Sequence, residues 1–155
     1  MVLLHIFMVR GDIYNDNMLC CNIPGSYIRP PSSCKLSCIY CVYGIPDESK
    51  RILKYDPIYN GITSFVGKEA HKCCDNGALG RDGCIYAANR GGQVLKIDTT
   101  NNLYYFVGNI SDSGIRKGWR GDAILGIDGC IYWPPRNVRR ILKYDPHINQ
   151  TSLVG

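Results

Sequence analysis

The chain of 155 residues repeats one pattern three times, and this repeat constrains the fold more than any other feature. Residues 41–57 align with residues 130–146 without a gap, and both segments contain the run Arg-Ile-Leu-Lys-Tyr-Asp-Pro. A middle copy reads Cys84-Ile85-Tyr86 and then Val94-Leu95-Lys96-Ile97-Asp98. The intervals from Cys41 to Cys84 and from Cys84 to Cys130 are 43 and 46 residues. Repeats of about 20 to 50 residues indicate a fold built from stacked equivalent units.

Each copy reads as four short strands. The first strand ends at a Leu-Gly pair and turns at Asp-Gly, a strong hairpin signal because both residues tolerate positive φ. Cys-Ile-Tyr forms the second strand, and Ile-Leu-Lys-Tyr, whose branched and aromatic residues suit a sheet, forms the third. An Asp and an Asn four residues apart then predict a turn capped by side chains. A last strand, such as 103–107, ends at Val-Gly in every copy.

The strands are apolar on both faces, because Cys84 and Tyr86 point to one side of the sheet and Ile85 to the other. Sheets buried on both faces fit units stacked against one another. No segment shows a sustained helical period. We therefore expect an all-β fold of β-propeller blades, each with four antiparallel strands, in three repeats at 41–67, 78–108 and 124–155. Propellers need about four to eight blades to close, so this propeller is incomplete.

The phrase Gly-x-Asp-Gly-x-Ile-Tyr, followed by Arg-Ile-Leu-Lys-Tyr-Asp-Pro and Val-Gly, resembles the repeats of NHL, streptogramin-lyase and gluconolactonase-like β-propellers. The resemblance covers residues 41–155. It implies four-stranded blades around a central channel. Members of this broad group include lactone hydrolases, lyases and binding scaffolds.

Residues 1–40 diverge from the repeat. Gly11-Asp12-Ile13-Tyr14 echoes the Asp-Gly-Cys-Ile-Tyr phrase, but Ile23-Pro24 and Pro30-Pro31 follow at spacings that no other copy uses. A degenerate blade, a fusion and a mispredicted exon are the open explanations. Within this segment, Val2–Val9 is predicted to be a strand, with a signal anchor as the weaker alternative.

Charge and composition limit the classes of partner that we expect. The net charge of +5 comes from 18 basic and 13 acidic residues scattered along the chain, so we do not expect nucleic-acid binding. No stretch has the roughly 20 apolar residues of a membrane helix, so we expect no membrane partner. Nine cysteines is an odd number and too few for a disulfide scaffold, which favours buried, reduced thiols and a cytoplasmic location.

The cysteines also raise two metal hypotheses. Cys34, Cys38 and Cys41 have the Cys-x3-Cys-x2-Cys spacing of a radical S-adenosylmethionine cluster loop. However, Cys41 belongs to the series with Cys84 and Cys130, and the strand-helix alternation of the barrel that carries such clusters is missing. A zinc knuckle at Cys38 and Cys41 would need adjacent cysteines as its second pair, which is an awkward chelating geometry. We therefore predict no metal site and no cofactor.

The candidate binding site lies at one end of the sheets. In an antiparallel blade, the loop between strands two and three and the link to the next blade share one end, and these are the segments that vary between the copies. Function concentrates in loops on a rigid scaffold. Tryptophan and arginine are favoured at binding hot spots. The predicted ligand-binding residues are Trp119, Trp133, Arg116, Arg120 and Arg136. The alternative is that Trp119 packs between blades and the arginines are solvated.

These features favour a binding or protein-interaction scaffold whose ligand is a protein or a small molecule on the loop face. A lactonase-like hydrolase or a streptogramin-lyase-like enzyme is the alternative. It lacks support, because no acidic metal cluster is visible and nothing positions His71 together with Glu69. We assign no catalytic residue. A fragment of a longer propeller protein is a third reading, and a homodimer that completes the ring is a further expectation.

Overall fold

The computed structural model describes residues 5–8, 41–46, 51–57, 61–69, 74–89, 91–108, 110, 118–119 and 121–155, without the side chains of 5–8, 75 and 76. The described residues form twelve β-strands and no helix, so the all-β prediction is confirmed. None of these residues belongs to a helix that could cross a membrane.

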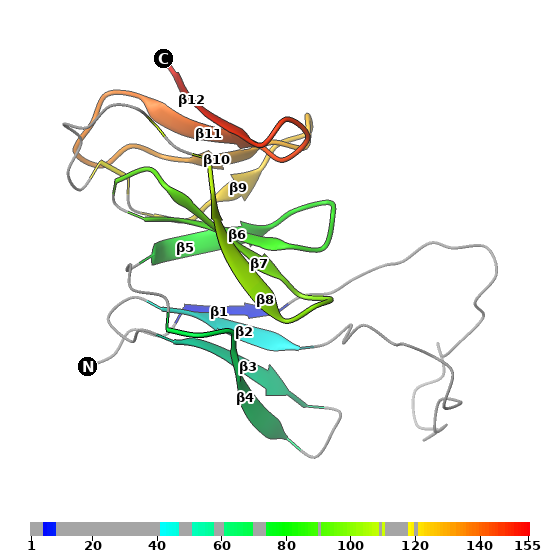
Figure 1. Ribbon diagram of the computed structural model, residues 1–155. Coiled ribbons are helices and arrows are strands. Elements are labelled where there is room, and N and C mark those ends of the chain that lie inside the picture. Colours follow the sequence, from blue (N-terminus) through cyan, green and yellow to red (C-terminus); the bar gives the residue numbers. More distant parts are fainter. Residues whose placement is uncertain are drawn as a thin grey trace.

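The strands form three antiparallel sheets of four, and within each sheet the strands pair in chain order (Figure 1). Sheet I contains β1 (His5–Met8), β2 (Val42–Ile45), β3 (Ile52–Asp56) and β4 (Ile62–Val66). Sheet II contains β5 (Cys74–Leu79), β6 (Ile85–Asn89), β7 (Val94–Asp98) and β8 (Leu103–Val107). Sheet III contains β9 (Ile124–Leu125), β10 (Ile131–Trp133), β11 (Ile141–Asp145) and β12 (Gln150–Val154).

Strand β1 comes from the segment that diverges from the repeat. The prediction of a strand within Val2–Val9 is confirmed, and His5 pairs with Ile45 in an antiparallel register. Sheet I therefore takes its first strand from a part of the chain more than 30 residues before β2. In sheets II and III the first strand directly precedes the second.

The turns follow the predicted turn chemistry. Gly83 and Gly129, the glycines of the two Asp-Gly pairs, have φ angles of 76° and 81°. Asp98 accepts backbone hydrogen bonds from Thr100 and Asn101 at 2.9 and 3.0 Å. Asn102 adopts a φ of 54°, which asparagine tolerates better than most residues. In the first copy, Asn60 lies outside the described residues.

Each sheet has two different faces, because neighbouring residues of a strand point to opposite sides. We call the first the tyrosine face: it carries a cross-strand Tyr–Lys pair, which is Tyr43–Lys54, Tyr86–Lys96 or Tyr132–Lys143. We call the second the leucine face: it carries the pair Leu53–Phe65, Leu95–Phe106 or Leu142–Leu153.

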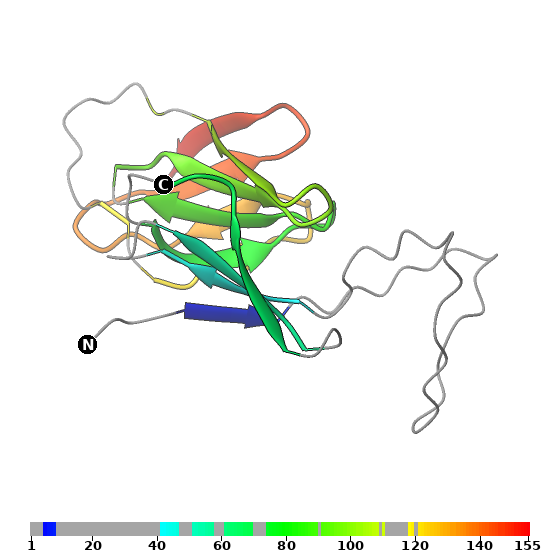
Figure 2. The ribbon, with the colours of Figure 1, turned by 60° about the horizontal axis from the view of Figure 1, so that its bottom comes forward.

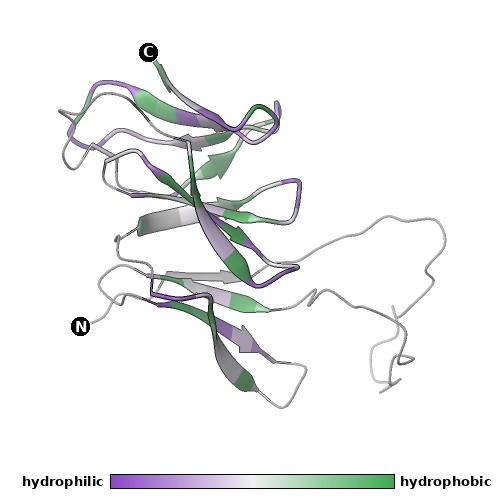
Figure 3. Cartoon of the chain, in the orientation of Figure 1, coloured by the Kyte–Doolittle hydropathy of each residue, from purple (hydrophilic) through white to green (hydrophobic). Residues whose placement is uncertain are grey.

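Sheet II lies between sheets I and III (Figures 1 and 2). The tyrosine face of sheet I packs on the leucine face of sheet II, where Tyr43 and Leu95 belong to one buried cluster. The tyrosine face of sheet II packs in the same way on the leucine face of sheet III, where Tyr86 and Leu142 belong to a second cluster. Figure 3 shows most of the hydrophobic residues on the strands and many of the hydrophilic ones at the turns, although the strands also carry hydrophilic residues, among them the lysines of the tyrosine faces. The same packing of a tyrosine face on a leucine face therefore joins sheet I to sheet II and sheet II to sheet III.

Strand β5 contacts β1, β2 and β9. The first strands of the three sheets therefore lie close together on one side of the stack.

Candidate functional site

The loops between second and third strands meet the links between sheets, as the antiparallel order predicts. Cys74, at the end of the link into sheet II, donates its backbone N–H to the carbonyl of Pro46, 2.9 Å away. In sheet III, Arg136 and Asn137 donate to the carbonyl of Gly118, at 2.9 and 3.1 Å. We call this end, formed by residues 91–93, 118–119 and 134–140, the loop end.

Trp119 is the central side chain of the loop end. It is 1% exposed, and its indole Nε1–H donates to the carbonyl of Arg140 at 2.9 Å. Its backbone forms a β-bridge with Pro135. On the other side it lies against Gly92, where an added Cβ would stand 2.8 Å from Cζ3 of the indole ring. Trp119 thus connects the β6–β7 loop of sheet II with the β10–β11 loop of sheet III.

Trp133 is also 1% exposed and sits on the leucine face of sheet III opposite Leu142. Both tryptophans belong to the buried cluster between sheets II and III. Direct contact of either ring with a ligand stays a prediction. In the structure both tryptophan rings lie beneath the loops, where they support the loop backbone.

The exposed part of the loop end is basic. Arg136, Arg139 and Arg140 are all exposed on the segment that joins β10 to β11. The backbone of this segment is held to Gly118, and Trp119 packs beneath it. The two other predicted site residues, Arg116 and Arg120, lie outside the described residues. Within the described part of the chain, the structure therefore brings Trp119, Trp133 and Arg136 together in one region.

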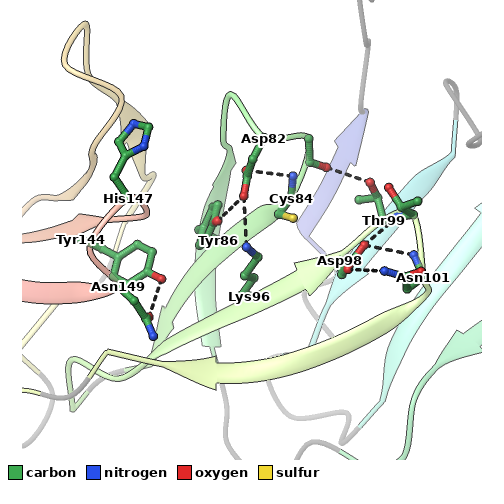
Figure 4. Close-up of polar contacts among 12 residues, drawn as sticks. Asp82, Cys84, Tyr86, Lys96, Asp98, Thr99, Asn101, Tyr144, His147 and Asn149 are labelled. Carbon is green, nitrogen blue, oxygen red and sulfur yellow. Dashed lines mark hydrogen bonds and ion pairs between the residues drawn. The ribbon is translucent and has the colours of Figure 1, made fainter.

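A polar cluster occupies the opposite end of sheet II (Figure 4). Asp82, in the β5–β6 turn, accepts a hydrogen bond from the Tyr86 hydroxyl at 2.6 Å and one from Lys96 Nζ at 3.1 Å. Its other carboxylate oxygen accepts the backbone N–H of Cys84 at 3.2 Å. We call this arrangement of aspartate, tyrosine and lysine a triad.

Sheet III repeats the triad with nearly the same geometry. Asp128 accepts from the Tyr132 hydroxyl at 2.7 Å, from Lys143 Nζ at 3.1 Å and from the Cys130 backbone at 3.1 Å. Sheet I has Ile39 at the equivalent sequence position and no aspartate. There, Lys54 donates instead to the side chain of Asn102 in sheet II, at 2.8 Å.

The protonation states of the triads suit a structural brace. Burial raises the pKa of Asp82, but hydrogen bonds from Tyr86 and Lys96 outweigh it, and the net pKa lies below the usual value. Burial and the nearby Asp82 raise the pKa of the Tyr86 hydroxyl. Burial lowers the pKa of Lys96, whereas the bond to Asp82 raises it and prevails. At neutral pH the carboxylate is charged and both donors keep their protons, so the triad joins a turn to a strand and offers no group poised for proton transfer.

The cysteines of the repeat are buried. Cys41, Cys84 and Cys130 are exposed by 0%, 8% and 3%. Burial raises the pKa of the Cys84 thiol to about 11, and Asp82 adds to the effect. Such a thiol is a poor nucleophile at neutral pH. Cys34 and Cys38 lie outside the described residues. Among the residues that are described, no three His, Cys, Asp or Glu side chains gather where they could hold a metal ion.

Two features of this region escaped sequence reasoning. The triads join Asp82 to Lys96 across 14 residues, and the repeated Asp-Gly and Lys positions are the signal that could have revealed them. The bond from Trp119 to Arg140 has no such signal, because Trp119 lies in a link that differs between the copies. No family model matches the sequence, and no curated protein matches it either.

Proposed function

We propose that the chain is part of a β-propeller and serves as a binding scaffold. Three observations support this architecture: the four-stranded sheets are antiparallel in chain order, they stack face to face by one rule, and their first strands lie close together. Blades that converge on their first strands are the arrangement of a propeller.

The ligand binds at the loop end, and Arg136 with Arg139 provides the main contact. The observation that carries this proposal is the support beneath the arginines. Trp119 is buried under the β10–β11 loop, bonds to the Arg140 carbonyl and fixes the backbone that presents the exposed guanidinium groups. A fixed loop loses less conformational entropy on binding than a free one.

The chemistry of the site favours a carboxylate-bearing partner, such as an acidic segment of another protein. Guanidinium groups match carboxylates in a bidentate geometry. The net charge of +5 adds a general attraction to anions. Binding of this kind weakens as salt rises, because exposed charges are screened.

The test uses a fluorescein-labelled peptide of ten glutamates and fluorescence anisotropy at low and moderate salt. We expect the double variant Arg136→Gln with Arg139→Gln to weaken binding by about tenfold, which corresponds to roughly 1.4 kcal/mol. The matched control is Ile127→Glu with Ile148→Glu. It changes the net charge by the same amount at two exposed turn positions at the opposite end of the sheets. Equal weakening in both double variants would mean that net charge, and not the loop end, carries the binding.

A further inference from the structure

The two ends of the stack are uncovered faces of opposite type. In sheet II the tyrosine face is covered by sheet III, and Ala78 and Val94 on it are 8% and 0% exposed. The equivalent residues on the tyrosine face of sheet III are Ile124 and Ile141, which are 64% and 38% exposed. Positions that are buried on the tyrosine face of sheet II are therefore exposed to solvent on the tyrosine face of sheet III, at the end of the stack.

The leucine face of sheet I is open in the same manner. Tyr55 and Phe65 on this face are 39% and 56% exposed. Their equivalents in sheet II are Ile97, which is 0% exposed, and Phe106, which is half-buried against sheet I.

The strand that covers a tyrosine face inside the stack has the same sequence as a strand on the open leucine face of sheet I. The tyrosine face of sheet II is covered by β11, whose Tyr144 ring lies 5.3 Å from the Tyr86 ring. Strand β3 of sheet I has the same sequence as β11, Ile-Leu-Lys-Tyr-Asp, and Tyr55 holds the position of Tyr144. The open leucine face of sheet I therefore contains a strand, β3, whose sequence is that of the strand that packs on the tyrosine face of sheet II.

The charges on the open tyrosine face are already paired. Lys143 is bonded to Asp128 at 3.1 Å, with side chains 28% and 41% exposed, and Lys96 is bonded to Asp82 at 3.1 Å with side chains 28% and 38% exposed, so packing against sheet III leaves such a pair at the edge of the contact. Covering sheet III would therefore leave no lysine charge without its partner, which is the main obstacle to burying a lysine.

We propose that the tyrosine face of sheet III binds the leucine face of sheet I of a second copy of this chain. Two copies associate head to tail through two such contacts and close one ring. Two copies of three sheets make six, within the range of about four to eight blades of known propellers. This inference rests on the propeller architecture proposed above, and it adds the partner that completes it.

Sedimentation equilibrium of the full chain tests the proposal. We expect a mass of about 35 kDa, twice the 17.3 kDa of one chain. Ile124→Lys on the tyrosine face of sheet III and Phe65→Lys on the leucine face of sheet I each place a charge in the contact and should give 17.3 kDa. The control Ile148→Lys changes an isoleucine that is 61% exposed in the β11–β12 turn and should leave the mass at two chains.

A mixing experiment identifies the geometry. Equal amounts of the Ile124→Lys and Phe65→Lys chains should associate again, more weakly than the wild type, because the intact sheet III of one chain and the intact sheet I of the other form one of the two contacts. Association through two copies of sheet III would instead survive Phe65→Lys, and that result overturns the head-to-tail contact. A monomeric wild-type chain with a normal β-sheet circular dichroism spectrum overturns the proposal. Since the glutamate peptide binds at the loop end, its binding by such a monomer would still support the proposed function, whereas a dimer that ignores the peptide would contradict only that function.

Discussion

Tyr86 and Tyr132 hold equivalent positions in neighbouring sheets, but their surroundings differ. Tyr86 is fully buried, with its ring 5.3 Å from that of Tyr144, whereas Tyr132 is half-buried at the uncovered end of the stack. Both hydroxyls donate to the aspartate of their own triad. The same local structure thus exists with and without a neighbouring sheet, and this contrast makes the contribution of the neighbour measurable.

The two triads should differ in their effect on stability. Asp82→Asn removes the charged acceptor of the Tyr86 hydroxyl, which belongs to a fully buried side chain, and we expect the free energy of unfolding to fall by about 1–3 kcal/mol. Asp128→Asn makes the same change next to Tyr132, which is only half-buried, so the loss should be smaller, whereas the Lys–Asp pairs of the two triads are about equally exposed. Urea unfolding of the two variants measures the difference. A larger loss for Asp128→Asn would contradict the role of burial.

Stability should decrease in acid. Asp82 and Asp98 have carboxyl pKa values below the usual one, because hydrogen bonds to the charged form outweigh the effect of burial. Hydrogen bonds from Tyr132 and Lys143 depress the pKa of Asp128 as well. The unfolded chain therefore binds more protons, and the stability present above an unfolded pKa of about 3.9 is lost as the pH falls toward the folded values. Urea unfolding between pH 7 and pH 3 should show this decline, with a shallower slope for Asp82→Asn; an unchanged slope would exclude Asp82 as a contributor.

Gly92 and Gly83 provide a matched pair for the packing of the loop end. Both have positive φ angles, 83° and 76°, so alanine at either position is strained by about 1–2 kcal/mol. At Gly83 an added Cβ meets nothing within 4 Å, whereas at Gly92 it meets the Trp119 ring at 2.8 Å. We expect Gly92→Ala to lower the free energy of unfolding by about 1–3 kcal/mol more than Gly83→Ala does, because the loop end would be overpacked. Equal losses of unfolding free energy in the two variants would mean that the Trp119 ring moves aside without cost.

Trp119 should act through packing and one hydrogen bond. Trp119→Phe keeps most of the ring volume and removes the bond to the Arg140 carbonyl, so we expect a loss of about 1 kcal/mol. Trp119→Ala also leaves a cavity and should lower stability by about 3–5 kcal/mol. Thermal or urea unfolding distinguishes the two. Similar values for both variants would place the ring outside the core.

The repeat predicted most of the strands and turns, because local residue patterns govern both. The pairs Asp82-Gly83 and Asp128-Gly129 form turns as expected, and the described phrases Cys84-Ile85-Tyr86 and Cys130-Ile131-Tyr132 lead into strands and are largely buried. The pairing of β1 with β2 was not predictable, since a short apolar run carries no sign of its distant partner. The position of Trp119 was not predictable for a related reason, because the link around it has no counterpart in the other copies.

Exposure at the ends of the stack could not be predicted from the repeat. Equivalent residues such as Val94 and Ile141 have the same local pattern, and only the presence of a neighbouring sheet separates 0% exposure from 38%. That three repeats are too few to close a propeller ring stays a prediction from the sequence. The structure adds which two faces are exposed at the ends of the stack, and these belong to the two types that pack on each other inside it.

Small-angle X-ray scattering over a series of protein concentrations tests the closure of the ring most directly. A closed pair predicts a compact particle of about 35 kDa, twice the mass of one chain, whose forward scattering per unit mass stays constant with concentration. A particle that elongates and grows as concentration rises would show that the open faces associate without closing. A particle that remains at 17.3 kDa would show that the two faces do not bind each other.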